Sequence, residues 1–137
     1  MPDASSVMAG VQAAVAAYAR ALDDGRPGDV AELFCPDGVA EIVGSGTFVG
    51  RDAIREGYAA FTPTAAQLHL VANTVVAPPA GDFALSAGDF AVATSDLAYF
   101  RRGSAGWALQ LVGRYEDTLH LADGVWRFHH RITTFRS

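Results

Sequence analysis

The sequence predicts a single α+β domain in which three helices cover one face of a curved, mostly antiparallel β-sheet. The residues up to about position 65 show helical periodicity with capping residues, whereas the remainder reads as long strands separated by Gly, Pro and Asp. The chain has 137 residues, which is enough to bury the core of one domain. No linker, repeat or low-complexity tract divides it, so we take residues 1–137 as one domain.

The first predicted helix begins after Ser5 or Ser6, either of which can cap it. It ends in the segment 23–29, where glycine and proline interrupt the pattern. Its apolar residues recur three or four positions apart, as on one face of an amphipathic helix. They are Val7, Val11, Val15, Tyr18 and Leu22.

Two shorter helices follow. Asp29 is placed to cap a helix over residues 30–35, which Pro36 closes. A third helix is expected over residues 51–61. Between them, residues 38–44 and 46–50 read as two short strands of a hairpin.

Four long strands complete the chain in a predicted meander. Because a sheet of such strands twists, it should curve and need the helices to cover its concave face. The expected ranges are 66–77, 89–102, 106–121 and 124–135.

Composition excludes several classes of function. The net charge is −5 with scattered basic residues, which argues against a nucleic-acid surface. No apolar run approaches the roughly 20 residues of a membrane helix, and the first residues do not resemble a secretory signal. We therefore expect a soluble cytoplasmic protein with neither nucleic acid nor membrane as partner. All ten basic residues are arginine, which excludes Schiff-base chemistry on lysine.

A histidine interrupts the apolar strand "QLHLVANT", residues 67–74. Strand alternation places His69 on one face with Val71 and Asn73, while Leu68, Leu70 and Ala72 take the other. Either His69 is a hydrogen-bonded core residue, or it lines a cavity where an imidazole takes part in chemistry. The choice depends on its partner.

Four segments, "YARALDDG" through "LFCPDG", "GTFVGRDAI", "LHLVANT" and "GRYEDTLHLADGVWRFHHR", together resemble the SnoaL-like branch of the nuclear transport factor 2-like superfamily. The resemblance implies a cone-shaped α+β fold, a pocket between the curved sheet and the first helices, and a homodimer formed through the sheets. It does not imply one function, because the superfamily contains isomerases, dehydratases, cyclases, hydrolases and non-catalytic domains.

The resemblance to the dehydratase and dehydrochlorinase branch also implies candidate site residues. An aspartate at the end of the first helix orients a histidine on the first long strand, and these positions carry Asp23 and His69. A cation on the last strand matches Arg131, and Tyr18 stands where the dehydrochlorinase pattern has lysine. His69 would then be a general base, Arg131 an electrostatic clamp and Tyr18 an auxiliary proton donor. Tyr18 and Asp23 could border one pocket mouth if the helix end unwinds.

Structural alternatives accompany each of these roles. Asp23 could be a helix-ending turn residue, and Arg131 could pair with Glu116 or Asp117 across the sheet. Simple alternation puts Arg131 on the same face as Arg127 and His129, and that face could be the convex one.

Other site patterns have weaker support. Glu41 could stand in for the aspartate base of the ketosteroid isomerase pattern, although its direction is open. His129 and His130 do not predict a metal site, because adjacent strand residues point apart.

The sequence therefore predicts a cofactor-independent and metal-independent lyase or isomerase, which acts on a compact, largely apolar, cyclic molecule. The alternative is a non-catalytic ligand-binding or subunit-interaction domain, since the same fold serves as the accessory subunit of ring-hydroxylating dioxygenases.

Overall fold

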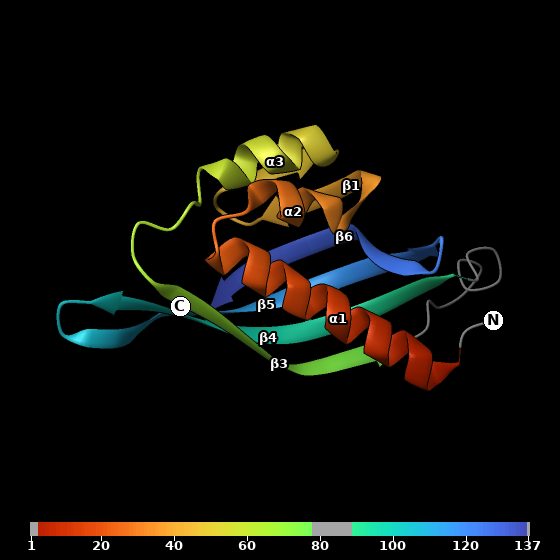
Figure 1. Cartoon of the computed structure of the whole chain (residues 1–137). Helices are drawn as coiled ribbons and strands as arrows, with labels where there is room; N and C mark the ends of the chain where they lie inside the picture. The colour runs from red at the N-terminus through yellow and green to blue at the C-terminus, as the bar shows by residue number, and fades with distance from the viewer. Residues whose placement is uncertain (1–2, 78–88, 137) are drawn as a thin grey trace.

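The computed structural model describes residues 3–77 and 89–136, with three helices on one side of a six-stranded sheet (Figure 1). No helix in these two ranges is long and apolar enough to cross a membrane. The helices are α1 (Ala4–Asp23), α2 (Pro27–Glu32) and α3 (Arg51–Ala59). The strands are β1 (Phe34–Ile42), β2 (Gly46–Val49), β3 (Gln67–Ala77), β4 (Phe90–Gly103), β5 (Gly106–Ala122) and β6 (Val125–Arg136).

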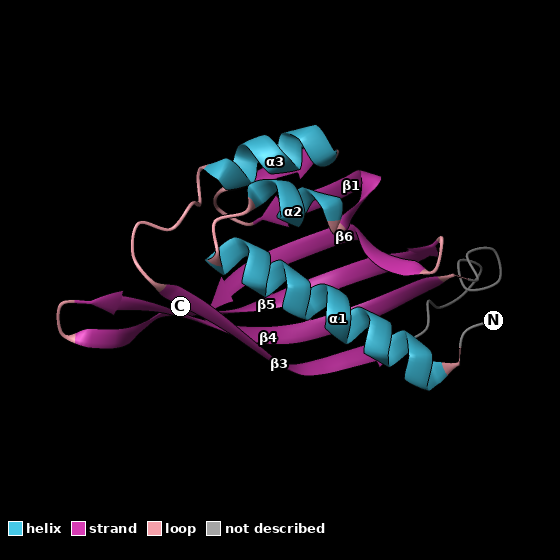
Figure 2. Ribbon diagram, in the orientation of Figure 1, coloured by secondary structure: helices cyan, strands magenta, loops and turns pink. Residues whose placement is uncertain are grey.

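The sheet follows the order β2-β1-β6-β5-β4-β3. The four long strands β3 to β6 form the predicted meander, and β1–β2 forms the predicted hairpin. Only one pairing between described strands, β1 with β6, is parallel. Figure 2 shows the sheet curving beneath α1, so the predicted α+β class with a curved, mostly antiparallel sheet is confirmed.

The predicted stripe of α1 is its buried face. Val11, Val15 and Tyr18 are buried, and Val7 and Leu22 pack against the same core. The cap, however, is Asp3 instead of Ser5 or Ser6, because the Asp3 carboxylate accepts a hydrogen bond from the Ser6 backbone N–H. Helix α1 thus crosses the concave side of the sheet with an apolar stripe, from Val7 to Leu22, of about four turns.

The second helix departs from the prediction at both ends. Helix α2 begins at Pro27, whose missing N–H costs nothing in the first turn, and Asp29 lies inside this turn without capping it. It ends at Glu32 because Phe34 already belongs to β1, where it pairs with Phe128 of β6 and is fully buried. Sheet pairing and burial of Phe34 therefore override the expected continuation of the helix to residue 35.

Candidate functional site

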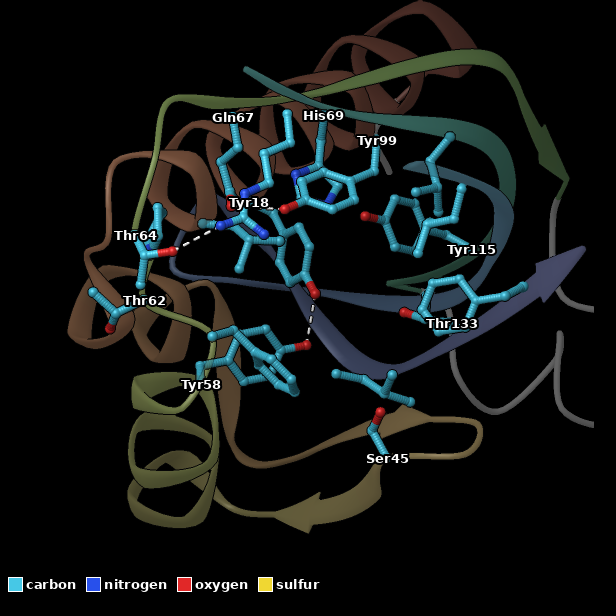
Figure 3. A pocket seen from close by; sticks show the side chains of 18 residues that line it. Tyr18, Ser45, Tyr58, Thr62, Thr64, Gln67, His69, Tyr99, Tyr115 and Thr133 are labelled. Atoms are coloured by element: carbon cyan, nitrogen blue, oxygen red, sulfur yellow. Dashed lines mark hydrogen bonds between the residues drawn. The ribbon is translucent and has the colours of Figure 1, made fainter. Parts of the chain in front are cut away.

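A cavity of about 400 Å³ lies between the concave face of the sheet and the C-terminal ends of α1 and α3 (Figure 3). Its rim includes exposed side chains such as Phe61 and Phe135, so it opens to solvent and is not sealed. All four tyrosines of the chain line it, namely Tyr18, Tyr58, Tyr99 and Tyr115. The wall is therefore aromatic, with hydroxyl groups as its main polar features.

His69 is one of the cavity-lining residues. It projects from β3 directly opposite Tyr99 of β4, and the two rings stack with centroids 4.7 Å apart and an interplanar angle of 21°. Its strand neighbours Leu68 and Leu70 are exposed on the opposite face of the sheet. The alternation predicted for this part of the strand is thus present, and it turns the imidazole toward the helices.

Asp23, the last residue of α1, lies against His69. Its Oδ1 is 2.6 Å from His69 Nδ1, and its Oδ2 accepts the backbone N–H of His69 at 2.7 Å. The side chains retain exposures of only 12% for His69 and 9% for Asp23. One carboxylate thus contacts both the ring and the backbone of the histidine, which fixes β3 against the end of α1.

Asp23 does not itself line the aromatic cavity. It borders a separate groove of about 600 Å³ between α1 and β3, while His69 borders both spaces. Helix α1 continues to Asp23 without unwinding, so Tyr18 and Asp23 stay on different sides of it, contrary to the expectation of one shared mouth. A molecule in the cavity would contact the imidazole of His69 but not the carboxylate of Asp23, which lies on the far side of the ring.

The hydrogen bonds around Asp23 determine its protonation. Burial acts to raise the pKa of the Asp23 carboxyl, but the hydrogen bonds from His69 and Gln67 outweigh it and hold the pKa below its ordinary value. Gln67 Nε2 donates to Asp23 Oδ1 at 3.1 Å, and Tyr99 donates to Gln67 Oε1 at the same distance. Because an ionised carboxylate only accepts hydrogen bonds, His69 Nδ1 carries the hydrogen of the shared contact.

Tyr18 lines the cavity from α1, and its hydroxyl lies 2.6 Å from that of Tyr58 on α3. Burial is the main cause that raises the pKa of Tyr58 to about 12, and it also raises the pKa of Tyr18 well above its ordinary value. Both phenols are therefore neutral near pH 7. The pair holds two hydroxyl hydrogens and uses one between its own oxygens, which leaves the other for a ligand.

Arg131 does not reach the cavity, which corrects the expectation of a clamp on a bound molecule. Its side chain is fully buried, and Nε and Nη2 donate to the two carboxylate oxygens of Asp117 at 2.8 and 3.1 Å. The alternative of a cross-sheet pair is the one found, with Asp117 as the partner. The guanidinium also lies under aromatic rings, 3.6 Å from the Tyr115 centroid and 4.2 Å from that of Tyr18.

A β-bulge explains why simple alternation misplaced Arg131. Phe128 pairs with Leu119 and His130 with Thr118, so His129 is an extra residue in β6. Past this residue the phase of alternation reverses, and Arg131 faces the core although Arg127 and His129 remain partly exposed. A buried guanidinium requires a counter-charge, and Asp117 stands directly opposite in the register.

Other sequence candidates lie outside the cavity. Glu41 borders His130, with 3.6 Å between its Oε1 and His130 Nε2, and it is not a cavity residue. Within residues 3–77 and 89–136, no cluster of His, Cys, Asp and Glu side chains has the arrangement of a metal site.

Sequence reasoning missed Gln67, Tyr58, Tyr99 and Tyr115 as site residues. The signal for Gln67 was available, since it is two residues before His69 and shares its face of the strand. Tyr99 and Tyr115 carried no such signal, because only the assembled sheet shows that Tyr99 stands opposite His69 and that Tyr115, opposite Ser95, lines the same cavity.

The family model described as SnoaL-like domain matches residues 3–132, which is nearly the whole chain. Comparison with curated proteins gives no match.

Solved structures share the fold at low identity. Rv3472 from Mycobacterium tuberculosis, a protein of unknown function studied as a variant, is 25% identical over 94% of this chain and 71% of its own, with a TM-score of 0.81. A protein from Novosphingobium aromaticivorans with the provisional name scytalone dehydratase is 22% identical over 95% and 84%, with a TM-score of 0.77. The β subunit of a provisionally named aromatic-ring-hydroxylating dioxygenase from the same organism is 20% identical over 98% and 92%, with a TM-score of 0.79.

Proposed function

Because the chain belongs to the SnoaL-like family, we propose that it is a small-molecule lyase or isomerase in which His69 is the general base and Asp23 orients it. The observation that carries this proposal is the 2.6 Å contact between His69 Nδ1 and Asp23 Oδ1, with the imidazole at the cavity wall and the carboxylate behind it. The substrate is a compact, largely apolar, cyclic molecule that fits a cavity of about 400 Å³.

The contact with Asp23 prepares His69 for proton abstraction. With the hydrogen on Nδ1 directed to the carboxylate, the lone pair of Nε2 is available to a substrate. When Nε2 takes a proton from carbon, the imidazolium forms next to an ionised carboxylate that stabilises it. An imidazole has an intrinsic basicity suited to this role near neutral pH.

The Tyr18–Tyr58 pair supplies the acid side of the reaction. In an elimination, the C–H electron pair forms the new double bond while the group on the neighbouring carbon departs with its own electrons. A departing hydroxyl takes a proton from the free O–H of the tyrosine pair and leaves as water, and the proton on His69 Nε2 restores the phenol through solvent. In an isomerisation, His69 returns the proton to a different carbon. The elimination combines proton transfers with loss of the leaving group, the isomerisation uses proton transfers alone, and neither needs a metal or cofactor.

A deuterium-exchange assay tests this function without knowledge of the natural substrate. Cyclic β-hydroxyketones would be incubated with the protein in D₂O, with the C–H exchange followed by NMR and the elimination by the absorbance of the conjugated enone. His69→Gln should lower both rates by at least about a hundredfold, the usual contribution of a general base. Asp23→Asn should lower them as well, because an amide cannot stabilise the imidazolium by its charge.

Asp24 offers a matched control for Asp23. It is the adjacent carboxylate, exposed and ion-paired with Arg26 at 3.3 Å, away from the cavity. Asp24→Asn should leave both rates unchanged. Exchange or elimination that is equally fast in the wild type and His69→Gln would exclude His69 as the base.

The second candidate, a non-catalytic ligand-binding or subunit-interaction domain, is favoured by the outer face of the sheet. Leu68, Leu70 and Leu109 are 42%, 53% and 54% exposed there, and the register places Leu68 and Leu109 on either side of Phe100.

This face also supports the predicted homodimer. Light scattering at micromolar concentration should report a dimer, and Leu70→Asp should shift it to monomer; a wild-type monomer would contradict the assembly. A cytoplasmic location stays a prediction.

A further inference from the structure

The aromatic cavity has a single strongly charged side chain in its wall. Its lining contains tyrosines, phenylalanines, aliphatic residues, hydroxyl residues, Gln67 and His69, and no carboxylate among the described residues. The exception is Arg101, whose guanidinium is a cation. The cavity thus presents one permanent positive charge to whatever binds in it.

The guanidinium of Arg101 is only partly engaged by the protein. Its Nη2 donates to the neutral hydroxyl of Thr64 at 3.0 Å, a contact drawn as a dashed line at Thr64 in Figure 3. No carboxylate lies within 4.0 Å of it in the part of the chain that the structure describes, whereas Arg55 and Arg114 each have one and Arg26 has two. Four of its five N–H donors are therefore left for solvent or a ligand.

The register places this charge near the proposed base. Arg101 stands opposite Gln67, and Tyr99 stands opposite His69 two residues further along the same two strands. Two residues of strand correspond to about 7 Å, and side chains two apart share a face. A molecule with an anionic group at Arg101 would therefore lay its body over Tyr99 and reach His69 with its far end.

We propose that the ligand of this cavity is a cyclic, largely aromatic carboxylic acid whose carboxylate binds Arg101 and Thr64 at the mouth. The four tyrosines and Phe61 contact the ring system, since flat rings pack well against aromatic side chains. Arginine and a carboxylate form a paired, charge-assisted contact that a neutral group of the same shape cannot reproduce. The proposal that such an acid is also a substrate rests on the proposed function, because it needs His69 to act as the base. The proposal that the acid binds at Arg101 does not depend on that function.

Two probes that differ only in charge test the proposal. Calorimetric titration would compare 2-naphthoate with 2-naphthamide, which have the same ring and nearly the same shape. Wild-type protein should bind the acid roughly tenfold more tightly, which corresponds to about 1.4 kcal/mol. Arg101→Gln should abolish this preference while leaving the affinity for the amide unchanged, and Arg101→Lys should retain part of it. Added salt should weaken only the binding of the acid to wild type.

Arg102 provides the matched control. It is the neighbouring arginine, lies outside the cavity wall and points to the other face of β4, so Arg102→Gln should keep the full preference. Equal affinity of the two probes for wild type, no binding of either, or an equal loss in Arg102→Gln would overturn the proposal. Asp23→Asn separates this binding proposal from the proposed function. That variant should lose turnover of the cyclic β-hydroxyketones and keep the preference for 2-naphthoate over 2-naphthamide.

Discussion

Two pairs on the inner side of the sheet each join an aspartate to a nitrogen-containing side chain, but their surroundings differ. Asp23 and His69 join the end of α1 to the edge strand β3, with 9% and 12% of their side chains exposed. Asp117 and Arg131 join the central strands β5 and β6, and neither side chain is exposed at all. The first pair borders the cavity through its imidazole, whereas the second is closed off from it by the rings of Tyr18 and Tyr115.

The difference shows how position in a sheet decides what a polar pair can do. An edge strand leaves one side open, so His69 keeps a ring nitrogen for a ligand while Asp23 holds the other. Asp117 and Arg131 lie where the rings of Tyr18, Tyr115 and Phe128 cover the central strands, so the charge there must be neutralised by a neighbour before the core can close. Burial raises the pKa of the Asp117 carboxyl despite the opposing charge of Arg131, and burial also acts to lower the pKa of Arg131, but Asp117 outweighs it and keeps that pKa above its ordinary value. We therefore assign reactivity to the edge pair and stability to the central one.

The largest expected effect is on the central pair. Arg131→Met should lower the free energy of unfolding by about 3–5 kcal/mol, because it leaves Asp117 buried without its counter-charge. Urea denaturation followed by circular dichroism measures this loss. Asp117→Leu combined with Arg131→Met should recover much of the stability, since no buried charge remains. A loss below about 1 kcal/mol for Arg131→Met would show that the central pair is not a structural requirement.

The edge pair should tolerate disruption better. Asp23→Asn removes a charged acceptor of three hydrogen bonds but leaves an amide of the same shape, so we expect a loss of about 1.5–3 kcal/mol and a folded protein. The ¹⁵N shifts of His69 should report hydrogen on Nδ1 in the wild type and a mixture of tautomers in Asp23→Asn. A single Nδ1–H tautomer in both proteins would show that Asp23 does not orient the ring.

This contrast also marks what the sequence could and could not predict. The helix stripe, the four long strands and the neighbourhood of Asp23 and His69 follow from periodicity and from the ordered segments shared with the SnoaL-like family. Periodicity and short ordered segments are local signals, so predictions that rest on them stay correct when a strand boundary is misplaced by a residue or two. Asp23 and His69 lie where a helix ends and where a strand alternates regularly.

The misplaced residue, Arg131, lies just past a bulge. One extra residue, His129, reverses the phase of alternation in β6, and nothing in the local sequence specifies it. The partner of Arg131 depends in turn on the register between β5 and β6, which is a property of the assembled sheet. The same holds for Tyr99 and Tyr115, which become cavity residues only when β4 and β5 stand in register with β3.

A smaller effect is expected at Gln67, which links the edge pair to the cavity wall. Gln67→Leu keeps the side chain volume but removes its hydrogen bonds to Asp23 and from Tyr99. Both hydrogen bonds are only partly buried, so their other partners can turn to solvent, and we expect a total loss of about 0.5–1.5 kcal/mol in urea denaturation, less than for Asp23→Asn. Gln110→Leu is a suitable control, because that exposed side chain bonds only the carbonyl of Ala108. Equal losses of stability in the two variants would show that the hydrogen bonds of Gln67 to Asp23 and Tyr99 do not stabilise the fold.

The smallest effect is the pH dependence that the edge pair gives to stability. Burial opposes ionisation of Asp23, yet the hydrogen bonds from His69 and Gln67 hold its pKa in the folded protein below the unfolded value of about 3.9. The unfolded state therefore binds the proton first, and the stabilisation is present above that pH and is lost as the pH falls through the folded pKa.

Stability would be measured by urea denaturation of the wild type and Asp23→Asn from about pH 5 to about pH 3. The gap between the two proteins should narrow as the pH falls, because protonation removes from the wild type the charge that the variant lacks at every pH. Asp24→Asn serves as the control, since that carboxylate is exposed and contacts neither His69 nor Gln67. A gap for Asp23→Asn that stays constant over this range would mean that the ionised form of Asp23 is not what holds β3 to α1.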